Sequence, residues 1–150
     1  MIPQESVLPR ALLTYIEGLK TRDVDLIGST FADDIRFVTP AKTMRREEIL
    51  EFLAALYRGF PDWSYDHDEP VVNGEGIYGV KWRQGGTHTG VLTFSGFKAV
   101  LATGKRVTIP EQFFYYQVRN KKLSEIRPDP VLGGAPRGIF EQIGVELPPL

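Results

Sequence analysis

Gly85-Gly86-Thr87-His88-Thr89-Gly90, followed by Ala102-Thr103-Gly104-Lys105-Arg106-Val107, is the part of the chain from which the fold can be read. One strand-like segment runs into the first motif, and another begins in the Thr-Gly-Lys-Arg turn of the second. Outward from there, alternation with a period of two predicts strands over about residues 63–72, 77–94, 105–118 and 122–129. The second half of the chain is therefore expected to form an antiparallel meander.

The first half has a helical period instead. Leu8, Leu12, Tyr15, Ile16 and Leu19 form one apolar stripe of an amphipathic helix. Helices followed by strands are typical of an α+β fold, in which a curved antiparallel sheet packs on the N-terminal helices. We expect a pocket between the helices and the concave side of that sheet.

Capping residues set the expected limits of the other elements. Asp23 is a candidate N-cap for a second helix through Phe31, and Thr43 for a third helix that ends at Gly59. A short strand is expected over residues 33–39 and a last helix over residues 136–143.

Length and composition limit the class of protein. The chain has 150 residues, 42% of them apolar, and no cysteine, which predicts one domain over residues 1–150 without disulfides or thiolate chemistry. The net charge of −1 gives no reason to expect nucleic acid or a membrane as a partner. Because no signal pattern or membrane-length apolar run is visible, we expect a cytoplasmic location.

Strand parity predicts which side chains share a face. In the segment 105–118, Val107, Ile109, Glu111, Phe113 and Tyr115 alternate with a second set that is nearly as apolar. A strand that is apolar on both faces is covered on both faces. We expect the helices on one side and a partner subunit on the other, so that the protein is a homodimer through its sheet.

Five motifs in matching order give the chain a family resemblance over about residues 10–145. They are residues 60–63 (FPDW), 86–90 (GTHTG), 102–107 (ATGKRV), 125–129 (EIRPD) and 141–145 (EQIGV). This pattern resembles the SnoaL-like polyketide cyclases, which belong to the larger NTF2-like group of cone-shaped α+β domains. The resemblance implies an intramolecular aldol cyclisation of a small polyketide-like or apolar carbonyl compound, without metal or cofactor.

The resemblance also implies that Asp129 is the general acid/base. Many relatives carry Trp at the position of Glu125, so this wall of the expected pocket differs here. By parity, Glu125 and Arg127 share a face with Asp129 and are expected to contact the substrate or to adjust the Asp129 carboxyl. The alternative is an ion pair between Arg127 and Asp129, which would make Asp129 a poor base.

His88 is the second candidate catalytic residue, as a donor to a carbonyl or a second base. The alternative is a structural strand histidine, either at a dimer contact or bonded to a neighbouring backbone carbonyl. His67 lies among three carboxylates, but neighbouring strand residues point to opposite faces, so no metal site is expected.

The remaining candidates are residues that could hold a flat or oxygen-bearing ligand: Tyr15, Trp63, Trp82, Glu111 and Tyr115. Two other functions stay open on these residues. One is a module that binds a small molecule without turnover, because a fold does not fix a function. The other is a double-bond isomerase or an epoxide hydrolase that uses Glu125 with Asp129.

Overall fold

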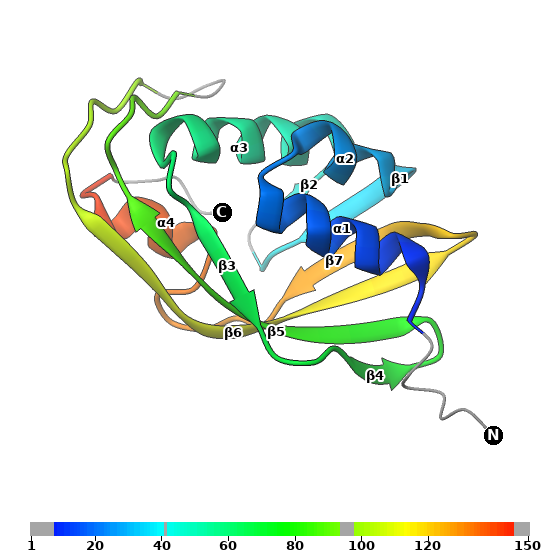
Figure 1. The fold of residues 1–150 in the computed structure, drawn as a ribbon. Helices are drawn as coiled ribbons and strands as arrows, with labels where there is room; N and C mark the ends of the chain where they lie inside the picture. The colour runs from blue at the N-terminus through cyan, green and yellow to red at the C-terminus, as the bar shows by residue number, and fades with distance from the viewer. Residues whose placement is uncertain (1–7, 41, 94–97, 146–150) are drawn as a thin grey trace.

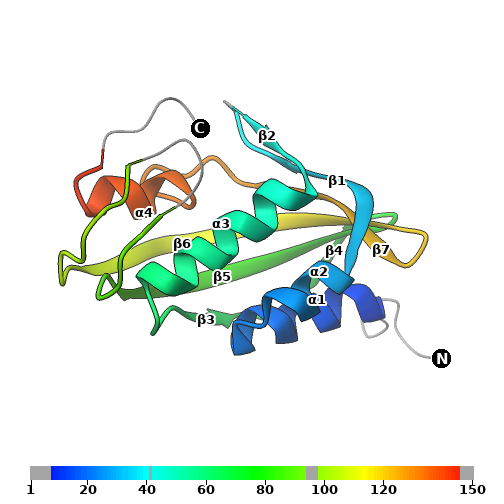
Figure 2. The same ribbon diagram turned by 90° about the horizontal axis from the view of Figure 1, so that it is seen from above.

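The computed structural model describes residues 8–40, 42–93 and 98–145. A curved sheet forms one layer and three helices lie across its inner face (Figure 1). These helices are α1 (Arg10–Thr21), α2 (Val24–Ser29) and α3 (Arg46–Gly59). The short helix α4 (Arg137–Gln142) lies at one end of the sheet, as Figure 2 shows from above.

The strands of the sheet follow the order β2-β1-β7-β6-β5-β3, and β4 pairs with β5. Their bounds are β1 (Phe31–Val38), β2 (Thr43–Met44), β3 (Ser64–His67), β4 (Val71–Gly74), β5 (Ile77–Thr87), β6 (Arg106–Arg119) and β7 (Lys122–Pro128). The prediction of an antiparallel sheet on N-terminal helices is confirmed, with one difference. β1 pairs with β7 in parallel, and the chain between these two strands forms β2, α3 and β3 to β6.

The expected element limits are partly right. Asp23 does cap α2, since its side chain accepts a hydrogen bond from the Leu26 N–H. Thr43 was expected to cap the third helix but lies in β2, and α3 instead begins after Arg45, whose backbone N–H is bound by Glu48. The segment predicted as one strand over residues 63–72 is divided into β3 and β4.

Two of the register shifts in the sheet affect the side-chain alternation of β6 and β7. The pairing of β5 with β6 changes register between Trp82 and Gln84, and after it the buried residues of β6 are Gln112, Phe114 and Tyr116. Before it they are Val107 and Ile109. A bulge adds one residue on one strand and so exchanges the two faces. Strict parity across β6 was therefore a wrong prediction, and Tyr116 rather than Tyr115 faces the helices.

A second bulge lies between β6 and β7 at Gln117 and Val118. As a result Leu123, Ile126 and Pro128 are all buried, while Arg127 remains exposed. Leu123 is thus buried and Arg127 exposed although they are four residues apart in one strand, because the bulge exchanges the two faces between them. No helix in the described part of the chain has the length and apolarity that crossing a membrane requires.

The buried side chains form two adjoining clusters. The larger one joins α1 and α3 to the inner sheet face through residues such as Leu12, Ile35 and Ile126. The smaller one packs α4 against the twisted end of β6 through Phe140 and Val107. The space left between these clusters contains the cavity described next.

Candidate functional site

An interior cavity lies between the helices and the inner face of the sheet. The volume open to the centres of water-sized molecules is about 50 Å³. One buried water needs about 10–15 Å³ on the same measure, so the cavity has room for several. Liners that stay half-buried, such as Met44, Phe52 and Ala135, mark its opening. The lining residues are Tyr15, Leu19, Phe37, Met44, Ile49, Phe52, Leu53, Leu56, Tyr65, Trp82, Gln84, Phe114, Tyr116, Ala135, Pro136 and Ile139.

The chemistry of this lining is apolar with a few hydrogen-bonding groups. The polar side chains are the hydroxyls of Tyr15, Tyr65 and Tyr116, the Gln84 amide and the Trp82 indole N–H. Among the described residues that line the cavity, none is Asp, Glu, His, Lys or Arg. A charged group placed there would lose its hydration without gaining a counter-ion, so the cavity favours a neutral ligand.

Hydrogen bonds connect most of these polar groups. Trp82 Nε1–H donates to the Tyr116 hydroxyl at 2.8 Å, and the Tyr15 ring lies 5.2 Å from that of Tyr116 between centroids. The hydroxyls of Tyr57 and Tyr65 are 2.8 Å apart. The cavity is thus bordered by the phenols of Tyr15 on α1, Tyr65 on β3 and Tyr116 on β6. Tyr65 is bonded to Tyr57 on α3, and Tyr116 to Trp82 on β5.

Burial keeps these phenols protonated. It raises the pKa values of Tyr15 and Tyr65 well above the ordinary tyrosine value, and that of Tyr57 to about 12. The pKa of Tyr116 is raised by burial as well, although the hydrogen bond from Trp82 opposes the rise. These groups therefore act as neutral hydrogen-bond donors over the physiological pH range.

Asp129 lies just after β7, with its backbone held on both sides. Its N–H donates to the Phe113 carbonyl at 2.9 Å and its carbonyl accepts from the Gln112 amide at 2.8 Å. The carboxyl is half-buried, acts electrostatically on Tyr115 and does not belong to the cavity lining. The alternation of β7 places it with Arg127 on the outer side of the sheet.

The expected ion pair of Arg127 is made with a different carboxylate. Arg127 Nη2 lies 3.2 Å from Glu125 Oε2, and Arg36 Nη2 lies 2.7 Å from Glu125 Oε1. Within the described ranges, no ion pair reaches the Asp129 carboxylate. Glu125 thus sits between two arginines on the outer face and outside the cavity lining.

His88 is fully buried beside the Phe60 ring, 5.1 Å away between centroids. Its Nδ1 accepts a hydrogen bond from the Thr103 N–H at 3.2 Å, so this nitrogen is unprotonated and Nε2 carries the hydrogen. Desolvation lowers the pKa of His88, which keeps the ring neutral. His88 does not line the cavity; it fixes the turn at Thr103 and Gly104.

The other predicted ligand-binding residues separate into two groups. Tyr15 and Trp82 line the cavity. Trp63 is buried next to it and donates to Gln84 Oε1 at 3.3 Å. Glu111 and Tyr115 face the opposite side of the sheet.

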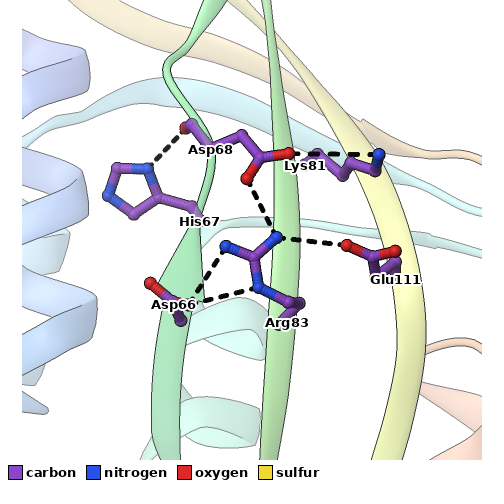
Figure 3. Close-up of polar contacts among 6 residues, drawn as sticks. All are labelled: Asp66, His67, Asp68, Lys81, Arg83 and Glu111. Atoms are coloured by element: carbon purple, nitrogen blue, oxygen red, sulfur yellow. Dashed lines mark hydrogen bonds and ion pairs between the residues drawn. The ribbon is translucent and has the colours of Figure 1, made fainter.

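The outer face carries a charged cluster that Figure 3 shows in detail. Arg83 contacts Asp66, Asp68 and Glu111 at 3.0 to 3.1 Å (Figure 3). His67 is bonded through Nδ1 to the Asp68 backbone carbonyl and takes no part in the cluster. Since these side chains are largely exposed, the ion pairs contribute little to stability. No His, Cys, Asp or Glu group that could hold a metal occurs among the described residues.

The polar liners Tyr65, Gln84 and Tyr116 were not among the candidates from the sequence, and Tyr116 shows why. Alternation through β6 assigned it to the other face, and only the register change near Trp82 brings it inward. The weak signal was Pro110 beside Glu111, two residues that interrupt a run of β-branched and aromatic residues.

Solved structures similar to this one share its fold. A proposed SnoaL-like polyketide cyclase from Jannaschia sp. CCS1 is 18% identical, with a TM-score of 0.66 over 91% of this chain and 93% of the other. IdmH, a proposed polyketide cyclase from Streptomyces antibioticus, is 19% identical, with a TM-score of 0.65 over 95% and 100%.

A third similar structure adds a bound small molecule. This protein from Catenulispora acidiphila has a ketosteroid isomerase-like fold and was solved with trimethylamine. It is 15% identical, with a TM-score of 0.64 over 93% of this chain and 96% of the other. At these identities the likeness establishes the fold, and the predicted NTF2-like α+β architecture is confirmed.

Sequence comparison supplies the family. No curated protein matches the chain significantly. Residues 12–126, which include most of α1, the cavity tyrosines and most of β7, match the family model described as the SnoaL-like domain. The chain therefore belongs to the SnoaL-like domain family.

Proposed function

We propose that this SnoaL-like protein binds a small, neutral, mainly apolar carbonyl compound in its interior cavity. The observation that carries the proposal is the lining, in which aromatic and aliphatic walls surround a few hydrogen-bond donors and the described liners include no charged residue. Such a site recognises shape and one or two oxygen atoms. The neutral state of the tyrosines supports the same ligand class, because a phenol donates readily to a carbonyl oxygen.

The first test maps where a neutral aromatic ketone binds. Acetophenone is titrated into labelled protein, and we expect the NMR signals of cavity residues such as Tyr15 and Trp82 to shift. The variant Ala135→Leu reduces the space at the opening and should weaken binding, since Ala135 is a half-buried liner. Ala102→Leu makes the same change at an exposed position and is the control. Shifts confined to the outer sheet face would contradict the proposal.

A second candidate function is acid/base catalysis on the bound ketone by Asp129, as in a cyclase. The observation that favours it is that Arg127 pairs with Glu125, so Asp129 is half-buried without a cation partner in the described part of the chain. A free carboxylate can remove an acidic C–H proton. For this reaction the substrate must extend from the cavity to the outer side of β7, where Asp129 lies.

Proton exchange measures this activity directly. If Asp129 is a base, the protein will accelerate deuterium incorporation into 2-tetralone in D₂O, and Asp129→Asn will remove the acceleration without changing the dissociation constant. Asp33→Asn, at an exposed position in β1, is the control. Equal exchange rates in wild type and Asp129→Asn would leave binding as the function.

We also propose that two copies associate through the outer sheet face. Phe113 and Tyr115 stack there with centroids 5.8 Å apart, and Lys81 Nζ lies 5.9 Å from the Phe113 ring. Aromatic groups of this kind are enriched at the centres of protein interfaces. Sedimentation of wild type should give a dimer and that of Tyr115→Arg a monomer; a wild-type monomer at all concentrations would refute the association.

A further inference from the structure

The hydroxyl of Tyr116 is a buried polar group of the cavity that has a fixed hydrogen-bond donor. It accepts a hydrogen bond of 2.8 Å from Trp82 Nε1–H, and both side chains are buried, with exposures of 0% and 2%. An indole N–H can only donate, so the direction of this bond is fixed. One acceptor position of the Tyr116 oxygen is therefore always occupied.

The ring of Tyr15 packs beside that of Tyr116, with the two rings 5.2 Å apart at 57°. A hydroxyl has one hydrogen and two acceptor positions. Because Trp82 takes one of the acceptor positions, the hydrogen of Tyr116 is available to a molecule in the cavity that this residue lines.

The bond from Trp82 also affects the strength of Tyr116 as a donor. Accepting a hydrogen bond polarises the Tyr116 O–H and makes it a stronger donor. Burial raises the pKa of Tyr116, and the hydrogen bond from Trp82 opposes that rise. Tyr116 is thus the phenol of the lining that an indole N–H orients and polarises.

We propose that Tyr116 donates the hydrogen bond that holds the carbonyl oxygen of the ligand, and that Trp82 is the positioning residue that orients and polarises this hydroxyl. The inference rests on the proposed function, because it concerns the ligand of the same cavity. It goes further in assigning the polar end of the ligand to one atom on β6. Trp82 then acts mainly through its N–H rather than by stacking.

The assignment predicts discrimination between a ketone and a hydrocarbon of the same shape. In α-methylstyrene a C=CH₂ group replaces the C=O of acetophenone, so only the ketone accepts the hydrogen bond. A hydrocarbon would leave the buried Tyr116 donor without a partner. The quantity to follow is the ratio of the two dissociation constants, which cancels general effects of a substitution on the cavity.

The experiment measures this ratio in wild type, Tyr116→Phe, Trp82→Phe and Tyr57→Phe. Tyr57→Phe is the matched control, because it removes a hydroxyl from a tyrosine pair but Tyr57 does not line the cavity. We expect Tyr116→Phe to lower the preference for the ketone about tenfold, as the loss of one buried hydrogen bond implies. Trp82→Phe should lower it less, and Tyr57→Phe should leave it unchanged.

Isotope-edited infrared spectroscopy provides a readout that a merely structural role would not change. The stretching band of bound ¹³C=O acetophenone should lie below its position in hexane, and should move toward that position in Trp82→Phe. If a variant does not fold, the wild-type band alone decides whether the carbonyl accepts a hydrogen bond.

The outcomes separate this inference from the proposed function. If acetophenone binds in the cavity but the ratio and the band are the same in wild type and Tyr116→Phe, the assignment of Tyr116 is wrong and cavity binding stands. If Trp82→Phe alone leaves both unchanged, the positioning role is wrong. If wild type binds neither compound, the proposed function and the inference both fail.

Discussion

His88 illustrates how the surroundings of one residue decide between a catalytic and a structural role. The sequence left both roles open, and the structure buries the ring, places Phe60 against it and directs Nδ1 toward Thr103. An imidazole that accepts from a backbone N–H inside the protein holds a turn in place. This structural role should make the free energy of unfolding depend on pH.

We predict that His88 destabilises the fold at acidic pH. Desolvation lowers its pKa in the folded state, so below about pH 6.5 the unfolded chain binds a proton that the folded chain does not. The free energy of unfolding should therefore fall as the pH drops below that value. Urea denaturation of wild type and His88→Gln at pH 5 to 8 measures this dependence. The free energy of unfolding of the variant should fall less steeply toward acidic pH than that of wild type. Identical slopes of the two proteins would contradict the prediction.

At the scale of elements, the bulges of β6 explain what the sequence could and could not predict. The helices, the long strands and the Asp23 cap follow from local patterns that the sequence shows directly. The register change beside Trp82 depends on the pairing of two distant strands, so parity failed there and exchanged Tyr115 for Tyr116. Two of the predicted ligand residues, Tyr15 and Trp82, do line the cavity. Tyr15 lies on α1, where the helical period applies, and Trp82 precedes the register change between β5 and β6.

Gln112 connects β6 to the segment that leads into α4. Its amide donates to the Asp129 carbonyl at 2.8 Å and its Oε1 accepts from the Ala135 N–H at 3.0 Å. Gln112 is 3% exposed, so removing it would leave buried backbone groups unpaired. This segment forms one wall of the cavity through Ala135 and Pro136.

We predict that Gln112→Ala lowers the free energy of unfolding by about 2–4 kcal/mol, from two lost hydrogen bonds in a buried site. Thr108→Ala, at an exposed position of the same strand, should change it by less than about 0.5 kcal/mol. Urea denaturation measures both, and hydrogen exchange should show faster exchange at Ala135 in Gln112→Ala. Equal stabilities of the two variants would contradict the connecting role.

At the scale of the whole molecule, the protein has a phenol-rich interior between its helices and its sheet. The fold class and the family were evident from the order of the sequence motifs, and the match over residues 12–126 establishes the family. A single domain over all of residues 1–150 stays a prediction. The interior could not be derived from the sequence, because it depends on how four tyrosines from α1, α3, β3 and β6 converge.

These tyrosines should make the fold sensitive to alkaline pH. Burial raises the pKa values of Tyr15, Tyr57, Tyr65 and Tyr116, so above about pH 10 the unfolded chain loses protons that the folded chain keeps. The free energy of unfolding should fall as the pH rises from 9 to 11. Tyr57→Phe should reduce the slope, and a stability that is constant over this range would refute the burial of the phenols.

A cavity that takes a neutral carbonyl compound should reject a charged molecule of similar shape. Acetophenone and benzoate have similar shapes but differ in charge, and their dissociation constants can be measured by NMR titration of the cavity residues. Because the described lining has no cation to pair with a carboxylate, benzoate should bind at least about 100-fold more weakly. Equal or tighter binding of benzoate in the cavity would show that the cavity does not select a neutral carbonyl compound.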